Sequence, residues 1–128
     1  MSNSALKTVI TQVAGEALAK YRFVVQDPHN AQRVVYPTAD GMKCLGVTDD
    51  SQRINFPVAI CLGGGTTWIQ AHGSISRGDL LIAKETTGKA DVYAGGSGQY
   101  EICAVALEDG SADDLVKVMI VHDSRHVA

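Results

Sequence analysis

The stretch Ile75-Ser76-Arg77-Gly78-Asp79-Leu80-Leu81-Ile82 combines a polar turn with a short apolar run. An apolar run this short, next to a turn, is typical of a buried β-strand rather than of a helix. Gly78 can adopt a positive φ without steric cost, and Asp79 can accept a hydrogen bond from the backbone of the same turn. The sequence therefore predicts a tight turn that leads directly into a buried strand starting at Leu80.

A similar pattern lies 57 residues earlier in the chain, where Phe23-Val24-Val25 aligns with Leu80-Leu81-Ile82. We therefore expect two similar β units, at about residues 18–50 and 75–109. Either an internal duplication or the common residue pattern of β-strands explains so few identities, and the sequence leaves both explanations open. The further alignments are Val35-Tyr36 with Val92-Tyr93 and, after a one-residue slip, Leu45-Gly46-Val47 with Cys103-Ala104-Val105.

Other short apolar or β-branched runs alternate with turns rich in Gly, Pro, Asp and Asn, which is the pattern of an all-β protein. Residues 15–20 are compatible with a helical turn, but no amphipathic helix of ordinary length is expected. We predict an all-β fold, a small β-barrel or β-sandwich-like body of short antiparallel strands. The expected strands are 8–13, 23–26, 33–36, 42–48, 58–62, 66–71, 80–83, 90–93, 100–107 and 115–121.

The body is expected to be a single domain over residues 8–121, which suits a chain of 128 residues. The small polar residues 1–7 are expected to form a mobile N-terminal arm, and residues 122–128 a C-terminal tail. No signal peptide precedes the first strand, and no apolar run is long enough to span a bilayer. These features predict synthesis in a reducing cytoplasm.

Composition excludes two classes of partner. The net charge of −3 argues against a general nucleic-acid binder, which would carry a basic excess, and gives no attraction to anionic membranes. Cys44, Cys61 and Cys103 lie far apart among apolar neighbours and form no CxxC pair. They are therefore expected to be buried free thiols rather than a disulfide framework.

Short motifs that could support chemistry are each better explained as turns or loops. Arg77-Gly78-Asp79 matches an integrin-binding tripeptide but fits a turn before a strand. Gly63-Gly64-Gly65 lacks the Lys and Ser/Thr of a P-loop and is expected to be a hairpin turn. Gly95-Gly96-Ser97-Gly98-Gln99 lacks the closing Gly of a nucleophile elbow. No base is evident for a nucleophile.

The candidate metal ligands are also incomplete. His122 and His126 are four residues apart but have no third ligand, so we interpret them as tail residues and keep a metal-bound form as an alternative. Asp49-Asp50 and Asp113-Asp114 lack the spacing of a Ca²⁺ loop. His29 and His72 are expected in loops. Trp68 could anchor either the core or an interface, and we favour the core. We expect no enzymatic activity, no cofactor and no metal.

The order of motifs along residues 8–121 resembles that of small bacteriophage capsid cement, or head decoration, proteins. The resemblance lies in the pattern of strands and turns rather than in any catalytic signature. The segments that carry it are Tyr21-Arg22-Phe23-Val24-Val25, Asp40-Gly41, Cys44-Leu45-Gly46-Val47, Val58-Ala59-Ile60-Cys61-Leu62-Gly63, Gly73-Ser74-Ile75-Ser76-Arg77-Gly78-Asp79-Leu80-Leu81 and Cys103-Ala104-Val105-Ala106-Leu107-Glu108-Asp109-Gly110.

This resemblance implies a non-enzymatic homotrimer that binds the major capsid protein on the outside of the expanded phage head and stabilises the head against internal DNA pressure. In lambda-type relatives an N-terminal arm adds a strand on the shell. Here that role would fall, by position, on Ser2, Asn3, Ser4, Ala5, Leu6 and Lys7. The alternatives are another virion module, such as a head-fibre base or tail adaptor, and a small-ligand-binding β-barrel with His72 or Asp79 in a pocket.

Overall fold

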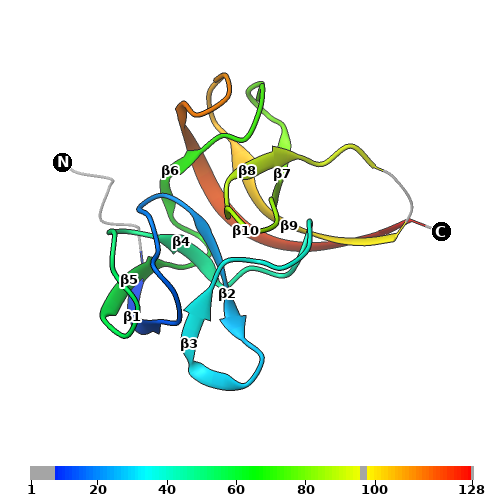
Figure 1. Cartoon of the computed structure of the whole chain (residues 1–128). Helices are drawn as coiled ribbons and strands as arrows, with labels where there is room; N and C mark the ends of the chain where they lie inside the picture. The colour runs from blue at the N-terminus through cyan, green and yellow to red at the C-terminus, as the bar shows by residue number, and fades with distance from the viewer. Residues whose placement is uncertain (1–7, 96–97, 128) are drawn as a thin grey trace.

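The computed structural model describes residues 8–95 and 98–127, in which there are ten strands and no helix. Figure 1 shows the first five strands gathered in one half of the molecule and the last five in the other. The predicted all-β fold is confirmed. The strands are β1 (Val9–Ala14), β2 (Phe23–Asp27), β3 (Asn30–Val35), β4 (Gly46–Thr48), β5 (Pro57–Cys61), β6 (Thr66–Gln70), β7 (Leu80–Ala83), β8 (Ala90–Val92), β9 (Gly98–Ala106) and β10 (Leu115–Val127).

The first half, β1 to β5, forms a small closed barrel with the strand order β1-β3-β2-β4-β5. The barrel closes because β5 pairs back onto β1, from Val9↔Cys61 to Val13↔Pro57. All its strand pairs are antiparallel except β1 and β3, which run parallel through Val13↔Arg33. That parallel pair departs from the antiparallel arrangement expected from the sequence.

The second half, β6 to β10, forms a five-stranded antiparallel sheet with the order β6-β10-β9-β7-β8. Among the described residues, one isolated parallel bridge between Ala71 and Ala90 joins its two edge strands. The second half is therefore a barrel of the same strand order whose seam, between β6 and β8, is open.

The two halves share not only strand order but also register, after a shift of 57 or 58 residues. The same hydrogen-bonded partners recur at the turn, at the start of the central strand and at the outer strand pair. The matching partners are Leu18↔Gln52 and Ile75↔Gly110, Phe23↔Val47 and Leu80↔Val105, and Gln12↔Val58 and Ile69↔Val116. A repeat of about half the chain therefore underlies the fold.

The turn that precedes β7 has the predicted geometry. Gly78 has a φ of 90°, and the Ser76 amide donates a hydrogen bond to the Asp79 carboxylate at 2.8 Å. The chain then enters β7, where Leu81 is fully buried. In the first half Tyr21 occupies the place of Gly78, with a φ of 64°.

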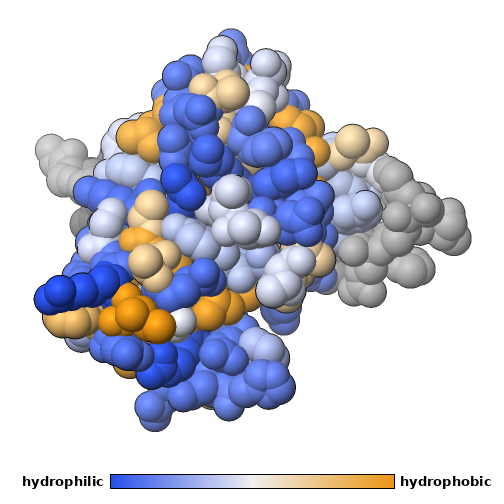
Figure 2. All heavy atoms as spheres, viewed as in Figure 1, coloured by the Kyte–Doolittle hydropathy of each residue, from blue (hydrophilic) through white to orange (hydrophobic). Residues whose placement is uncertain are grey.

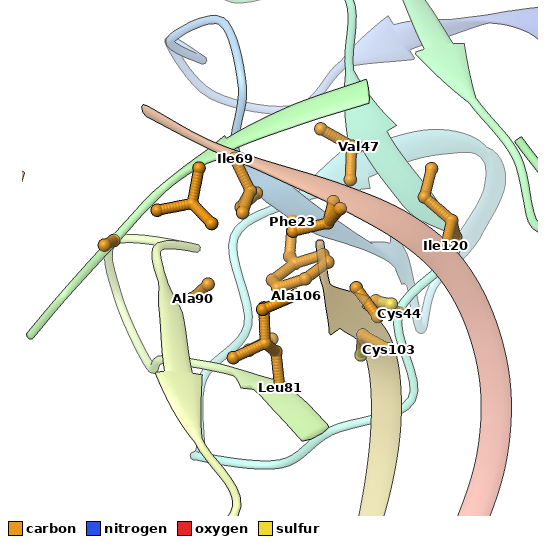
Figure 3. Close-up of a cluster of buried hydrophobic side chains, with 14 of the residues drawn as sticks. Phe23, Cys44, Val47, Ile69, Leu81, Ala90, Cys103, Ala106 and Ile120 are labelled. Atoms are coloured by element: carbon orange, nitrogen blue, oxygen red, sulfur yellow. The ribbon is translucent and has the colours of Figure 1, made fainter. Parts of the chain in front are cut away.

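The core has two parts because the strands of the barrel bury both of their faces. Inside the barrel, Val24 packs with Val34, Val58 and Ile60. On the opposite face of β2, Phe23 and Val25 pack against the second half, which explains the wholly apolar start of that strand. Figure 3 shows this shared core, with Phe23 among side chains from both halves.

The open seam of the second half is filled by the first half. The Gln70 amide at the end of β6 donates to the Tyr21 carbonyl at 3.0 Å, and the Phe23 amide donates to the Gly88 carbonyl at 2.7 Å. The Arg22 guanidinium joins both sides of the seam, through two bonds to the Gln70 side-chain oxygen and one to the Thr87 carbonyl.

Three predictions of local structure were wrong. The strand expected at 42–48 begins only at Gly46. Gly63-Gly64-Gly65 is not a hairpin turn, because β5 and β6 belong to different halves. The last strand continues to Val127, so residues 122–127 are not a tail: their backbone pairs with β9. The prediction of buried free cysteines is confirmed.

Candidate functional site

The residues predicted to contact a capsid, Ser2 to Lys7, lie outside the described part of the chain. The prediction for that segment therefore stays a prediction. Within the described residues, large apolar side chains that are exposed mark the surfaces that could bind another protein. These side chains are Val9, Ile54, Phe56, Trp68, Leu115 and Met119.

Three of these exposed side chains share the outer face of β6 and β10. Trp68 is 43% exposed, Leu115 48% and Met119 41%. Strand alternation explains the arrangement, because Val116 and Val118 face the core and their neighbours on β10 must face outward. In the register of the sheet, Lys117 lies opposite Trp68.

Aromatic and cationic groups extend this face toward the first half. The Lys117 ammonium lies 5.7 Å from the centroid of the Trp68 ring, and the Tyr21 ring lies 6.5 Å from it on the other side of the seam. The Lys20 ammonium lies 4.8 Å from the Tyr21 centroid. We call the face made by Lys20, Tyr21, Trp68, Leu115, Lys117 and Met119 the Trp68 surface. It has the chemistry of an interface anchor, because it offers exposed aromatic and apolar area beside cations.

The prediction that Trp68 lies in the core was wrong. Trp68 and Ile69 are adjacent on one strand, so their side chains point to opposite faces, and it is Ile69 that is fully buried.

A second exposed group lies at the end of the barrel, in the loop before β5. Ile54 and Phe56 are exposed there, and the Arg53 guanidinium stacks 4.3 Å from the Phe56 centroid. Figure 2 shows hydrophobic atoms beside strongly hydrophilic ones at this end of the molecule, where β1 and β5 lie in Figure 1. This group is smaller than the Trp68 surface and involves one loop only.

Several of the other residues singled out by sequence hold turns and loops. The Asp79 carboxylate holds its own turn, and the Arg77 amide donates to Asp109 at 2.7 Å. Asp50 accepts from the Ala59 amide, and Asp114 from the Ser111 amide. The amide of His72 donates to the Ala90 carbonyl across the seam of the second half. None of these contacts brings a nucleophile and a base together.

The pKa of the Asp113 carboxylate is lowered by a neighbouring cation. The Lys89 ammonium lies 2.6 Å from its Oδ1 atom and, by hydrogen bond and charge, holds the pKa of Asp113 below its ordinary value. This pair is at the surface, where an ion pair contributes little to stability.

Two further hollows lie on the surface. A hollow of about 180 Å³ is lined by Asp40, Asp91, Tyr93 and Tyr100 among others, and one of about 330 Å³ by Glu16, Tyr36 and Thr86 with their neighbours. In the described part of the chain no three His, Cys, Asp or Glu side chains could hold a metal ion. The side chains of His122 and His126 lie outside that part.

Among the described residues, no helix is long and apolar enough to cross a lipid bilayer.

Comparison with known proteins finds a likeness in fold only. No known protein family matches the sequence, and no curated protein matches it. Among solved structures, the chain is similar to one described as the head fiber gp8.5 N base in bacteriophage phi29. The TM-score is 0.69 and the identity 16%, over 90% of this chain and 94% of that one. The fold of this protein is thus similar, over nearly its whole length, to that of a phage head-fibre base.

Proposed function

We propose that this chain is a structural module of a bacteriophage virion, attached to the outside of the head as the base of a head fibre. The observation that carries the proposal is the likeness in fold to a head-fibre base over 90% of the chain. A binding role is also supported by the Asp79 and Asp114 carboxylates, because each accepts a hydrogen bond from the backbone of its own turn.

A head-fibre base, one of the alternatives left open by the sequence, is now favoured over a capsid cement protein. Both roles need a small β-rich body on the outside of the head, and both explain the motifs that suggested cement. The fold likeness favours the fibre base, since the matching chain is described as a fibre base and the likeness covers 90% of this chain.

The partner is the major capsid protein, and the protein works as an oligomer, with a homotrimer as the expected form. Cyclic symmetry lets one surface patch act in every copy, so that modest contacts add up to strong attachment. The Trp68 surface supports this role because aromatic side chains beside cations are enriched where interfaces have their strongest contacts.

The first experiment locates the chain in the particle. Virions that contain it are labelled with an antibody against residues 50–56, the exposed loop before β5, and imaged by electron microscopy. The fibre-base proposal expects label at separated points on the head where fibres attach. Label on the tail alone would overturn it.

A second experiment separates a fibre base from cement. Phage that lack the gene are grown, and the heads are heated and exposed to osmotic shock. The proposal expects heads that lose their fibres but keep their DNA as well as wild-type heads do. Heads that lose their DNA at lower temperature would show that the chain is cement.

The Trp68 surface is tested by substitution. Purified Trp68→Ala protein and wild-type protein are each mixed with expanded empty heads, and the amount that pellets with the heads is measured. Light scattering of each protein alone gives its mass in solution. Removal of an interface anchor of this size is expected to weaken binding roughly thirtyfold, by about 2 kcal/mol. Phe56→Ala, at the other exposed group, serves as the matched control and should bind as wild type does.

A further inference from the structure

We propose that Cys44 and Cys103 are a peroxide-sensitive thiol pair, which on oxidation becomes a disulfide that joins the two halves of the protein. The inference concerns a modification site and holds whether or not the chain is a fibre base.

The two thiols belong to different halves and meet in the shared core. Cys44 lies just before β4 of the barrel, and Cys103 lies on β9 of the second half. Cys44 is 2% exposed and Cys103 is fully buried. The two side chains belong to one core cluster, and Figure 3 shows them side by side at its edge. The Cys103 sulfur also lies 3.8 Å from the Met42 carbonyl oxygen, which holds it near the segment that carries Cys44.

A hollow that is open to solvent lies beside Cys44. Gln26, Lys43, Cys44 and Leu45 line this hollow, which has a volume of about 230 Å³. Such a hollow holds several molecules the size of water, each of which takes roughly 30 Å³. Hydrogen peroxide is little larger than water, so it can enter this hollow, which Cys44 lines and the fully buried Cys103 does not.

The chemistry needs only the two thiols and one peroxide. The Cys44 thiolate attacks one peroxide oxygen, the O–O bond breaks, and Cys44 becomes a sulfenic acid while hydroxide leaves and takes up the thiol proton as water. The Cys103 sulfur then attacks the Cys44 sulfur and forms the S–S bond. The sulfenic oxygen leaves as a second water with the Cys103 proton. Two thiols are oxidised, and one peroxide is reduced to two waters.

Because both thiols are buried, we expect peroxide to oxidise them slowly. Removal from water, followed by the influence of the neighbouring Cys103 thiol, raises the pKa of the Cys44 thiol. Because the thiolate is the nucleophile, the oxidation rate should rise as the pH is raised from 7 to 9. The pair is thus suited to gradual covalent closure during a long residence in an oxidising medium rather than to fast signalling.

The test uses the full chain and two variants. Wild type, Cys61→Ala and Cys103→Ala are treated with hydrogen peroxide, then analysed by intact mass, by peptide mapping without reductant and by thermal unfolding. Wild type and Cys61→Ala should lose two hydrogens, give a linked peptide pair and unfold about 10 °C higher, since the bond closes a loop of about 60 residues. Cys103→Ala should give no linked peptide and should react with a sulfenic-acid probe at Cys44.

A link from Cys44 to Cys61, or a folded wild-type protein that keeps all three thiols at pH 9 while the urea-unfolded protein is oxidised, would overturn the proposal. If Cys103→Ala does not fold, the peptide map of Cys61→Ala decides alone, because it retains only the two thiols in question.

Discussion

The two halves of this protein have the same strand order and register but differ in how they close. In the first half β1 and β3 pair in parallel, and the barrel closes through its own five strands. In the second half the equivalent strands share one bridge at Ala71 and Ala90, and residues 21–23 of the first half occupy the gap. One repeat is therefore complete in itself, while the other is completed by its neighbour.

This difference implies that the halves do not unfold independently. Phe23 belongs to the first half by sequence, but its side chain is part of the core of the second. Residues at the seam should therefore have larger effects than their equivalents one repeat away, and that comparison can be tested position by position.

The largest effect is expected for Phe23→Ala. Phe23 is fully buried between the halves, and truncation of such a side chain costs about 3–5 kcal/mol of unfolding free energy. Its equivalent Leu80 is only partly buried, so Leu80→Ala should cost about 1–2 kcal/mol. Urea titration of both variants measures the two values. Equal losses would contradict the claim that the seam joins the halves.

A smaller effect is expected for Gly88→Ala. A Cβ atom at Gly88 would lie 2.3 Å from the Phe23 carbonyl oxygen, and its φ is 68°, so we expect a loss of about 2–3 kcal/mol. Gly78 also has a positive φ, but a Cβ there would meet no atom within 4 Å. Gly78→Ala should therefore cost only the backbone term, about 1 kcal/mol. The ranking fails if calorimetry gives both variants the same unfolding temperature.

The smallest effect is expected where the two halves use different side chains for one contact. In the first half the Arg33 guanidinium donates to Asn55, and in the second Lys89 donates to Asp113 at the equivalent place. Asn55 and Asp113 have φ values of 72° and 68°. Asp113→Asn should therefore change the unfolding temperature near neutral pH by less than about 2 °C.

The pH dependence distinguishes this carboxylate from its amide equivalent. Because the pKa of Asp113 is lowered in the folded state, its charge stabilises the fold above the ordinary Asp pKa, and that contribution disappears as the pH falls through the lowered value. Wild type and Asp113→Asn should thus become equal in acid. The substitution Lys89→Met should return the pKa of Asp113 toward its ordinary range, as measured by NMR titration. An unchanged pKa in this variant would exclude Lys89 as the cause.

The sequence predicted the parts of the fold that depend on local chemistry. The turn at Gly78 and Asp79 needs a positive φ and a short acceptor, and both are visible in the residues. The one-residue slip that aligned Leu45-Gly46-Val47 with Cys103-Ala104-Val105 agrees with the register, because Phe23 pairs with Val47 as Leu80 pairs with Val105.

Other features depend on contacts that sequence does not reveal. The sequence aligned Val35 with Val92, a shift of 57 residues, but the structure shifts this strand by 56. The Gly15 amide donates to the Val34 carbonyl, and the equivalent His72 amide donates to the Ala90 carbonyl. An irregularity in the β2–β3 pairing, between Gln26 and Asp27, accompanies that shift and leaves no clear mark in the residues. The polar end of β10 pairs with β9 although its residues lack the apolar pattern of a strand. The exposed position of Trp68 could have been suspected, because the neighbouring Ile69 competes for the core.

The completion of the second half by residues 21–23 also bears on how the protein is made. A chain leaves the ribosome from its N-terminus, and its first domains can fold before the rest is synthesised. The barrel can close as soon as β5 has emerged, but Phe23, Val25, Val47 and Cys61 then face water until β6 to β10 arrive. Because synthesis adds roughly 5–20 residues per second, the nascent protein exposes this apolar face for some seconds. We expect chaperones to bind the face during that time.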